Sequence, residues 1–158
     1  MIGEIRDFET AQIAIQASLT GHLVLATLHT NDSPSAVTRL IDMGVEPFLL
    51  ASSLLGVLAQ RLVRKLCPQC SRPAADGPGR VADGCAACNH TGYRGRTGVF
   101  ELLEADDALL AAVHERAAEA ELRRLATATG MRSMRDDGMR WVDAGQTSLA
   151  ELLRVTRE

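Results

Sequence analysis

The sequence predicts an α/β fold that carries an inserted cysteine module and ends in helices. Three observations support it: two apolar runs flank a stretch with helical spacing, two Cys-x-x-Cys pairs interrupt the middle, and the last third shows repeated helix signals. The 158 residues are enough for one hydrophobic core. We expect a partial α/β core over 1–66, a cysteine module over 67–96, and a return strand with a helical subdomain over 97–158.

The first region is predicted to run strand, helix, strand. An apolar run ends in acidic residues over 1–7, and residues 9–19 have helical spacing, entered through Asp7 and closed by Gly21. The run from Leu23 to Leu28 is almost wholly apolar, which is typical of a strand buried on both faces of a parallel sheet.

Helices are expected next from Ser33 to Met43, ending at Gly44, and from Pro47 through Leu66. The second would turn these apolar side chains mostly inward: Phe48, Leu49, Leu54, Leu55, Leu58 and Leu62. The cations Arg61, Arg64 and Lys65 would then lie at the C-terminal end of this helix, where positive charge interacts favourably with the helix dipole. The alternative is that they contact another protein.

A short strand is expected at 99–103, followed by helices near 106–116, 118–128, 131–144 and 148–156. Ser148 and Glu151 have capping-box spacing at the start of the last helix.

The four cysteines form two Cys-x-x-Cys pairs, Cys67 with Cys70 and Cys85 with Cys88, separated by fourteen residues. Four thiolates suit tetrahedral Zn²⁺, although the gap is one residue below the usual zinc-ribbon range. Disulfides are the alternative, and His90 is a possible substitute ligand. Four cysteines leave no open position for water, so a zinc ion here would be structural and not catalytic.

The composition limits the classes of function that the chain can have. The net charge is −3 and aromatic residues make up 3% of the chain, which disfavours nucleic-acid binding. The sequence shows neither a signal peptide nor an apolar run of membrane-spanning length, so we expect a cytoplasmic protein.

Two motifs resemble the Walker B and histidine boxes of the secretion ATPases that drive type II secretion and type IV pili. They are Gly-Glu-Ile-Arg-Asp at 3–7 and Thr-Gly-His-Leu-Val-Leu-Ala-Thr-Leu-His-Thr-Asn at 20–31, and the resemblance continues through 39–48 and 59–67. It is strongest to the type II secretion protein E family, then to pilus-assembly ATPases. Pilus-retraction ATPases are more distant, because they are not expected to carry the cysteine module.

The resemblance implies the C-terminal part of a RecA-like P-loop ATPase sheet, with Glu4 as the Walker B glutamate and His22 and His29 as histidine-box positions. A regular strand would hold the two histidines about 23 Å apart on opposite faces. His29 lies at the carboxyl end, where ligands of open α/β sheets bind, so we assign it the γ-phosphate contact and give His22 a structural or relay role. Arg6 is either a further phosphate or interface contact or a surface partner of Asp7 or Glu9.

No segment matches Gly-x-x-x-x-Gly-Lys-Ser/Thr, the loop that cradles nucleotide phosphates. ATP with Mg²⁺ is therefore expected only in a complete protein, with Met1 either internal to it or the start of a truncated frame, and the isolated chain is predicted to be inactive. The resemblance further implies a homo-oligomer, a hexamer, bound at the inner face of the bacterial inner membrane to secretion platform proteins. The alternatives are a pilus-assembly ATPase fragment and a non-catalytic, zinc-stabilised assembly module.

Overall fold

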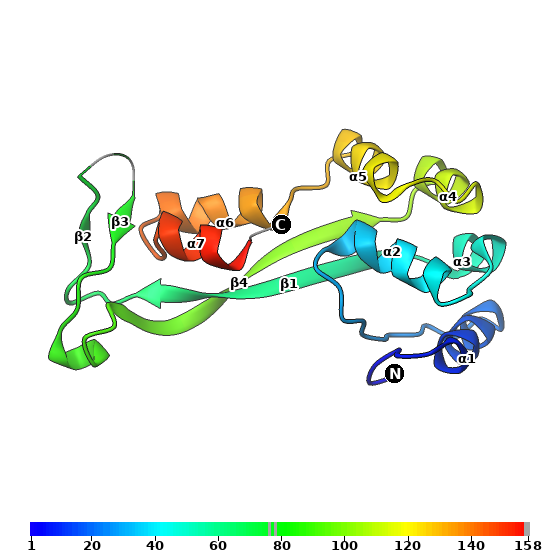
Figure 1. Cartoon of the computed structure of the whole chain (residues 1–158), viewed down its shortest axis with the longest axis horizontal. Coiled ribbons are helices and arrows are strands. Elements are labelled where there is room, and N and C mark those ends of the chain that lie inside the picture. Colours follow the sequence, from blue (N-terminus) through cyan, green and yellow to red (C-terminus); the bar gives the residue numbers. More distant parts are fainter. Residues whose placement is uncertain (76, 78, 157–158) are drawn as a thin grey trace. The chain divides into compact units, whose positions relative to one another are not determined.

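The computed structural model describes residues 1–75, 77 and 79–156, so Pro78 of the cysteine loop and the last two residues of the expected helical subdomain lie outside it. The chain divides into two compact units. Unit 1 comprises Met1–Leu58 and Leu102–Met131, and unit 2 comprises Ala59–Glu101 and Arg132–Glu158. Figure 1 labels the elements along the chain. Among the described residues, no helix combines the length and apolar character needed to cross a membrane.

Unit 1 contains five helices among its described residues: α1 (Phe8–Leu19), α2 (Ser33–Asp42), α3 (Pro47–Ser53), α4 (Asp107–His114) and α5 (Glu119–Ala128). The Asp7 carboxylate accepts a hydrogen bond from Thr10 N at 2.8 Å, which confirms the predicted start of α1. Gly21 follows its end with a φ of +92°, as a C-terminal cap requires. Buried apolar side chains from all five helices form one core.

Helix α2 agrees with the prediction, except that Asp32 and not Ser33 caps it. The Asp32 carboxylate accepts a hydrogen bond from Ser35 N at 2.9 Å, and the Ser35 hydroxyl donates to the Asp32 carbonyl oxygen at 3.0 Å. Gly44 then takes a φ of +100°, a conformation that favours glycine and ends the helix where expected.

The two buried strands expected at 1–7 and 23–28 are not formed as predicted. Ile2 N donates to Leu25 O at 2.8 Å and Ile5 N to Thr27 O at 2.9 Å, but neither segment is assigned as a strand. Leu23 is 72% exposed. A strand buried on both faces needs neighbours on both sides and covering layers, whereas the described backbone hydrogen bonds of 23–28 reach one neighbouring segment.

The long helix predicted over 47–66 is also wrong. After α3 the chain becomes extended at Leu54 and continues as the strand β1 (Gly56–Leu66). Gly56 and the β-branched Val57 and Val63 disfavour a helix here. The inward orientation also fails for four of the predicted side chains, which are more than half exposed: Phe48, Leu55, Leu58 and Leu62. Arg61, Arg64 and Lys65 therefore lie on a strand, and the helix-dipole interpretation no longer applies.

Strand β1 pairs with β4 (Tyr93–Glu104), which contains the strand predicted at 99–103. The short strands β2 (Arg72–Pro73) and β3 (Arg80–Val81) form an antiparallel pair, and the 3₁₀ turn η1 (Ala86–Cys88) follows. These elements connect the two Cys-x-x-Cys pairs within unit 2.

Unit 2 is completed by α6 (Met134–Asp143) and α7 (Leu149–Val155). Together with α4 and α5, these helices lie within the four ranges predicted for the end of the chain. A small core joins Val63, Val99, Val142 and Leu152. The indole Nε1 of Trp141 donates to Gly98 O at 3.1 Å, which ties α6 to β4.

Candidate functional site

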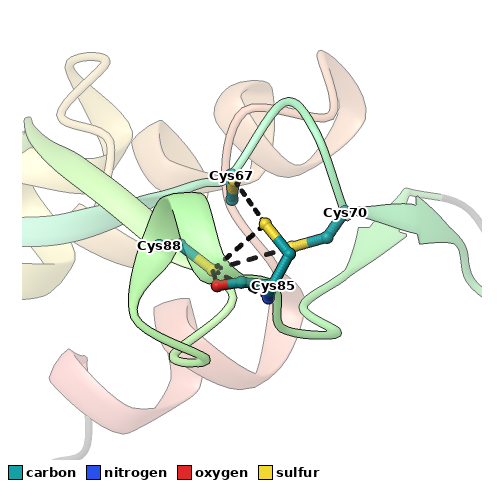
Figure 2. A group of neighbouring side chains, drawn as sticks. All are labelled: Cys67, Cys70, Cys85 and Cys88. Carbon is teal, nitrogen blue, oxygen red and sulfur yellow. Dashed lines mark hydrogen bonds between the residues drawn. The ribbon is translucent and has the colours of Figure 1, made fainter.

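The four cysteines converge because two tight turns present them. Cys67 directly follows β1, and Ser71 N donates to Cys67 O at 3.0 Å, which curls the chain back past Cys70. Cys85 caps η1 and Cys88 ends it. Figure 2 shows the four side chains turned toward one another.

The sulfur positions fit a tetrahedral metal. All four Sγ atoms lie within 4.8 Å of one another, with 3.9 Å between Cys67 and Cys85 and 3.8 Å between Cys70 and Cys88. A tetrahedron with metal–sulfur bonds of about 2.3 Å has sulfur–sulfur edges of about 3.8 Å. A disulfide would need about 2.05 Å, and all four cysteines are free. The converging group does not include His90.

Backbone N–H groups support the thiolate of Cys88. Cys85 N donates to its Sγ at 3.3 Å, and Gly92 N does so at 3.2 Å. Burial opposes ionisation of Cys88, but these donors outweigh it and lower the pKa of the thiol to about 6. Burial and the neighbouring sulfurs raise the pKa of Cys70 to about 12. Thiols held this close suit a cation that neutralises them together.

The second cluster lies around Glu4. His29 Nε2 lies 3.0 Å from Glu4 Oε1, and Arg6 contacts Glu4 Oε2 at 2.5 Å. The hydrogen bond from Arg6 is the largest cause that lowers the pKa of the Glu4 carboxyl. The Glu4 side chain is 21% exposed, whereas that of His29 is 86% exposed, so the imidazole is open to a ligand.

The structure thus brings together three of the four predicted nucleotide-facing residues: Glu4, Arg6 and His29. The ion pair of Arg6 is with Glu4 and not with Asp7 or Glu9. His22 follows the end of α1, where its Nδ1 lies 3.2 Å from the Thr20 hydroxyl, an arrangement that suits the structural role given to it.

Sequence reasoning missed a buried carboxylate in unit 2. Glu151 is fully buried and contacts Arg64 at 2.6 Å and Arg154 at 2.8 Å. The Arg64 guanidinium also lies 4.1 Å from the centre of the Tyr93 ring. The predicted capping box is therefore half formed: Glu151 N donates to Ser148 Oγ, but the carboxylate binds the two arginines. The pair of Arg154 with Glu151 at i, i+3 was the available signal.

The family model described as "Type II/IV secretion system protein" matches residues 1–154. The "Type II secretion system protein HxcR" of Pseudomonas aeruginosa is 69% identical over 158 residues, covering 100% of this chain and 33% of that protein. The "Type II secretion system ATPase E" of Vibrio cholerae is 57% identical over 173 residues, and the match covers 100% of this chain and 34% of that protein.

Among solved structures, that of the pilus retraction motor PilT with bound ADP matches at a TM-score of 0.71 and 25% identity, covering 99% of this chain and 38% of that one. This confirms an α/β fold of the kind seen in that motor. The chain spans about a third of the length of the secretion relatives. On these grounds the chain belongs to the type II/IV secretion system protein family.

Proposed function

We propose that this chain is the C-terminal part of an ATPase that couples ATP hydrolysis to type II secretion by driving pseudopilus assembly. The observation that carries the proposal is the pairing of Glu4 with His29 at 3.0 Å in a member of this family. Two residues that lie 25 positions apart in the sequence, one from each motif, meet there, as a shared site requires. We further propose that the surrounding segments belong to a RecA-like sheet and that 97–158 form a return strand with a helical C-terminal subdomain.

Glu4 is the proposed catalytic residue that orients the attacking water, and His29 the proposed γ-phosphate contact. Both Glu4 carboxylate oxygens are engaged, by Arg6 and by His29, yet a carboxylate has about four lone-pair sites and retains capacity for a water. Arg6 would contribute positive charge beside the phosphates, and His22 would support the loop after α1. Bound Mg²⁺ would neutralise phosphate charge in the complete protein.

Zn²⁺ is the proposed occupant of the tetracysteine centre, held by Cys67, Cys70, Cys85 and Cys88. Its role would be structural: with four thiolates bound, no coordination position is left for water. The loop between the pairs is short of buried apolar side chains, so metal binding would supply folding energy that burial does not.

The complete protein is proposed to be a hexamer that lies at the cytoplasmic face of the inner membrane and contacts secretion platform proteins. The chain lacks the phosphate-cradling loop, so nucleotide turnover requires residues beyond those printed. This absence favours the second candidate function, a zinc-stabilised assembly module, for the chain taken alone. A pilus-assembly ATPase is the alternative for the whole protein.

The proposal is tested in the complete parent protein with Glu4→Gln and His29→Ala. We expect His29→Ala to lower kcat by roughly 10²-fold or more while nucleotide affinity changes less, because its contact matters most as charge develops at the γ-phosphate. Steady-state ATPase assays and binding of a fluorescent nucleotide measure the two effects. His22→Ala is the matched control, with a smaller expected loss of kcat.

Equal losses of affinity and rate in His29→Ala would assign the residue a structural role. For the isolated 158-residue chain we expect no ATP turnover above background, and turnover abolished by Glu4→Gln would contradict that expectation.

A further inference from the structure

Unit 2 contains a basic pocket that the proposed ATPase chemistry does not use. It is a cavity of about 650 Å³ whose lining includes Lys65, Ser71, Arg80, Arg94 and Gln146. The lining comes from β1, the turn after Cys67, β3, β4 and the loop before α7. Three of the lining side chains are cationic and none of the described lining residues is acidic.

Two of the three cations are available to a ligand. Arg80 Nε donates to Ser71 Oγ at 3.1 Å, and its terminal nitrogen contacts the Ser71 carbonyl, so this guanidinium is held in place. Lys65 and Arg94 are exposed, and no partner for either occurs among the described side chains. The pocket therefore combines one fixed cation with two for which the described residues offer no counter-charge.

Three backbone N–H groups of the pocket are already hydrogen-bonded. Leu66 N donates to Gln146 O at 2.8 Å, Ser71 N to Cys67 O at 3.0 Å, and Gln146 N to Trp141 O at 2.9 Å. Phosphate sites typically offer free backbone N–H groups, at a helix N-terminus or in a nest. This pocket offers side-chain charges instead, and an arginine fork binds a carboxylate through two hydrogen bonds.

Charge together with the lack of apolar anchors favours an acidic protein segment over a membrane surface. The sequence of unit 2 has twelve Lys and Arg residues against eight Asp and Glu, although the whole chain has a net charge of −3. None of the large exposed apolar side chains of unit 2 lines the cavity, so the pocket lacks the apolar anchors that hold proteins in a bilayer interface.

We infer that the basic pocket is a docking site for an acidic peptide segment of a protein partner, with carboxylates placed on Lys65 and Arg94. Arg80, fixed by Ser71, presents the third positive charge. The tetracysteine centre adjoins this pocket, because Cys67 and Ser71 belong to the same turn and Ser71 lines the pocket. The inference is independent of the proposed ATPase site, since none of its residues lies in the Glu4 cluster.

The test uses the zinc-loaded chain and a fluorescein-labelled peptide of four Glu-Gly repeats, with a Gln-Gly peptide of equal length as the probe control. Fluorescence anisotropy measures affinity at low and moderate salt. The variant is Lys65→Gln with Arg94→Gln. The matched control, Arg96→Gln with Arg132→Gln, removes two exposed charges of unit 2 that lie outside the pocket.

We expect the pocket variant to lower affinity for the Glu-Gly peptide by at least about fivefold, with the control variant within about twofold of the unaltered chain. Circular dichroism checks that both variants remain folded. If both variants lowered the affinity for the peptide equally, binding would depend on the overall positive charge of unit 2 and not on the pocket, and that would overturn the inference. So would displacement of the peptide by millimolar inorganic phosphate, or binding through Lys65 and Arg94 to anionic phosphatidylglycerol vesicles but not to the peptide.

Discussion

Glu151 shows how much one side chain organises in unit 2. Its carboxylate is fully buried, yet it receives hydrogen bonds from the Arg64 backbone and side chain and from Arg154. Thr147 Oγ1 also donates to Arg64 O at 2.8 Å, and Tyr93 and Ser148 share a hydrogen bond at 2.7 Å. These contacts fasten the start of α7 to the end of β1, immediately before the first cysteine.

Glu151→Gln should lower the free energy of unfolding by about 1 to 3 kcal/mol, because one amide cannot satisfy the donors that converge on the carboxylate. Urea denaturation followed by circular dichroism measures the loss. Glu121→Gln is the control, since Glu121 pairs with Arg124 on an exposed face of α5 and should lower the free energy of unfolding much less. Equal losses in both variants would contradict a special role for Glu151.

The contribution of Glu151 should also depend on pH. Burial raises its pKa, but the hydrogen bonds from Arg154 and Arg64 outweigh burial and hold the pKa well below its usual range. Because the folded pKa is the lower one, the stabilisation is complete above about pH 5 and is lost as pH falls through about 4 and below. The difference in unfolding free energy between the unaltered chain and Glu151→Gln should therefore shrink between pH 7 and pH 4. A constant difference would contradict this assignment.

Residues within a local motif could be predicted from the sequence, whereas residues joined over a long distance could not. The cysteines and the Glu4 and His29 positions follow from spacing and resemblance. The Arg64–Glu151 contact joins residues 87 apart in the chain. No periodicity links two such positions, so only the folded chain reveals the pair.

Among the elements, β1 differs most from the prediction, because a helix was expected over part of 47–66 where the chain forms this strand. Leucines throughout 47–66 satisfy a helical pattern, but they fit a strand as well, because short apolar runs do not separate the two periods. Gly56 was the informative residue. A Cβ built there would lie 2.9 Å from the Leu103 carbonyl oxygen, so the neighbouring backbone approaches too closely for any side chain.

Gly56→Ala should therefore destabilise unit 1 by about 1 to 3 kcal/mol, because the clash is with backbone and not with a flexible side chain. Gly3→Ala is the matched control, since a Cβ there meets nothing within 4 Å. Thermal unfolding followed by circular dichroism compares them. If the Gly56→Ala chain were as stable as the control, the backbone near Leu103 would have moved to accept the added Cβ at little cost, and the prediction would be wrong.

For the whole molecule, the α/β class and the cysteine module could be predicted, but the division into two units could not. Both units are discontinuous, and the boundary falls inside β1 and again inside β4. Sequence motifs instead suggested three consecutive regions, and that division stays a prediction. The expected sheet strands at 1–7 and 23–28 failed because strand formation depends on neighbours that a local apolar run does not specify.

Removing the proposed zinc ion should affect the units unequally. The tetracysteine centre lies wholly in unit 2, whereas the core of unit 1 contains no cysteine. After chelation we expect amide hydrogen exchange to accelerate over 67–92 and in α7, with α4 and α5 unchanged. Elemental analysis of the reduced protein should give about one zinc per chain. Less than half a zinc, or equal acceleration in α4 and α5, would contradict the assignment.

Trp141, which hydrogen-bonds to Gly98 and has the Arg140 guanidinium 4.6 Å from the centre of its ring, is the single tryptophan of the sequence. It belongs to unit 2. Indole emission on excitation near 295 nm therefore comes from unit 2 alone, and unit 1 contributes no signal. Loosening of the cysteine-bearing unit can be followed optically without a label, as a change in the colour and intensity of one fluorophore.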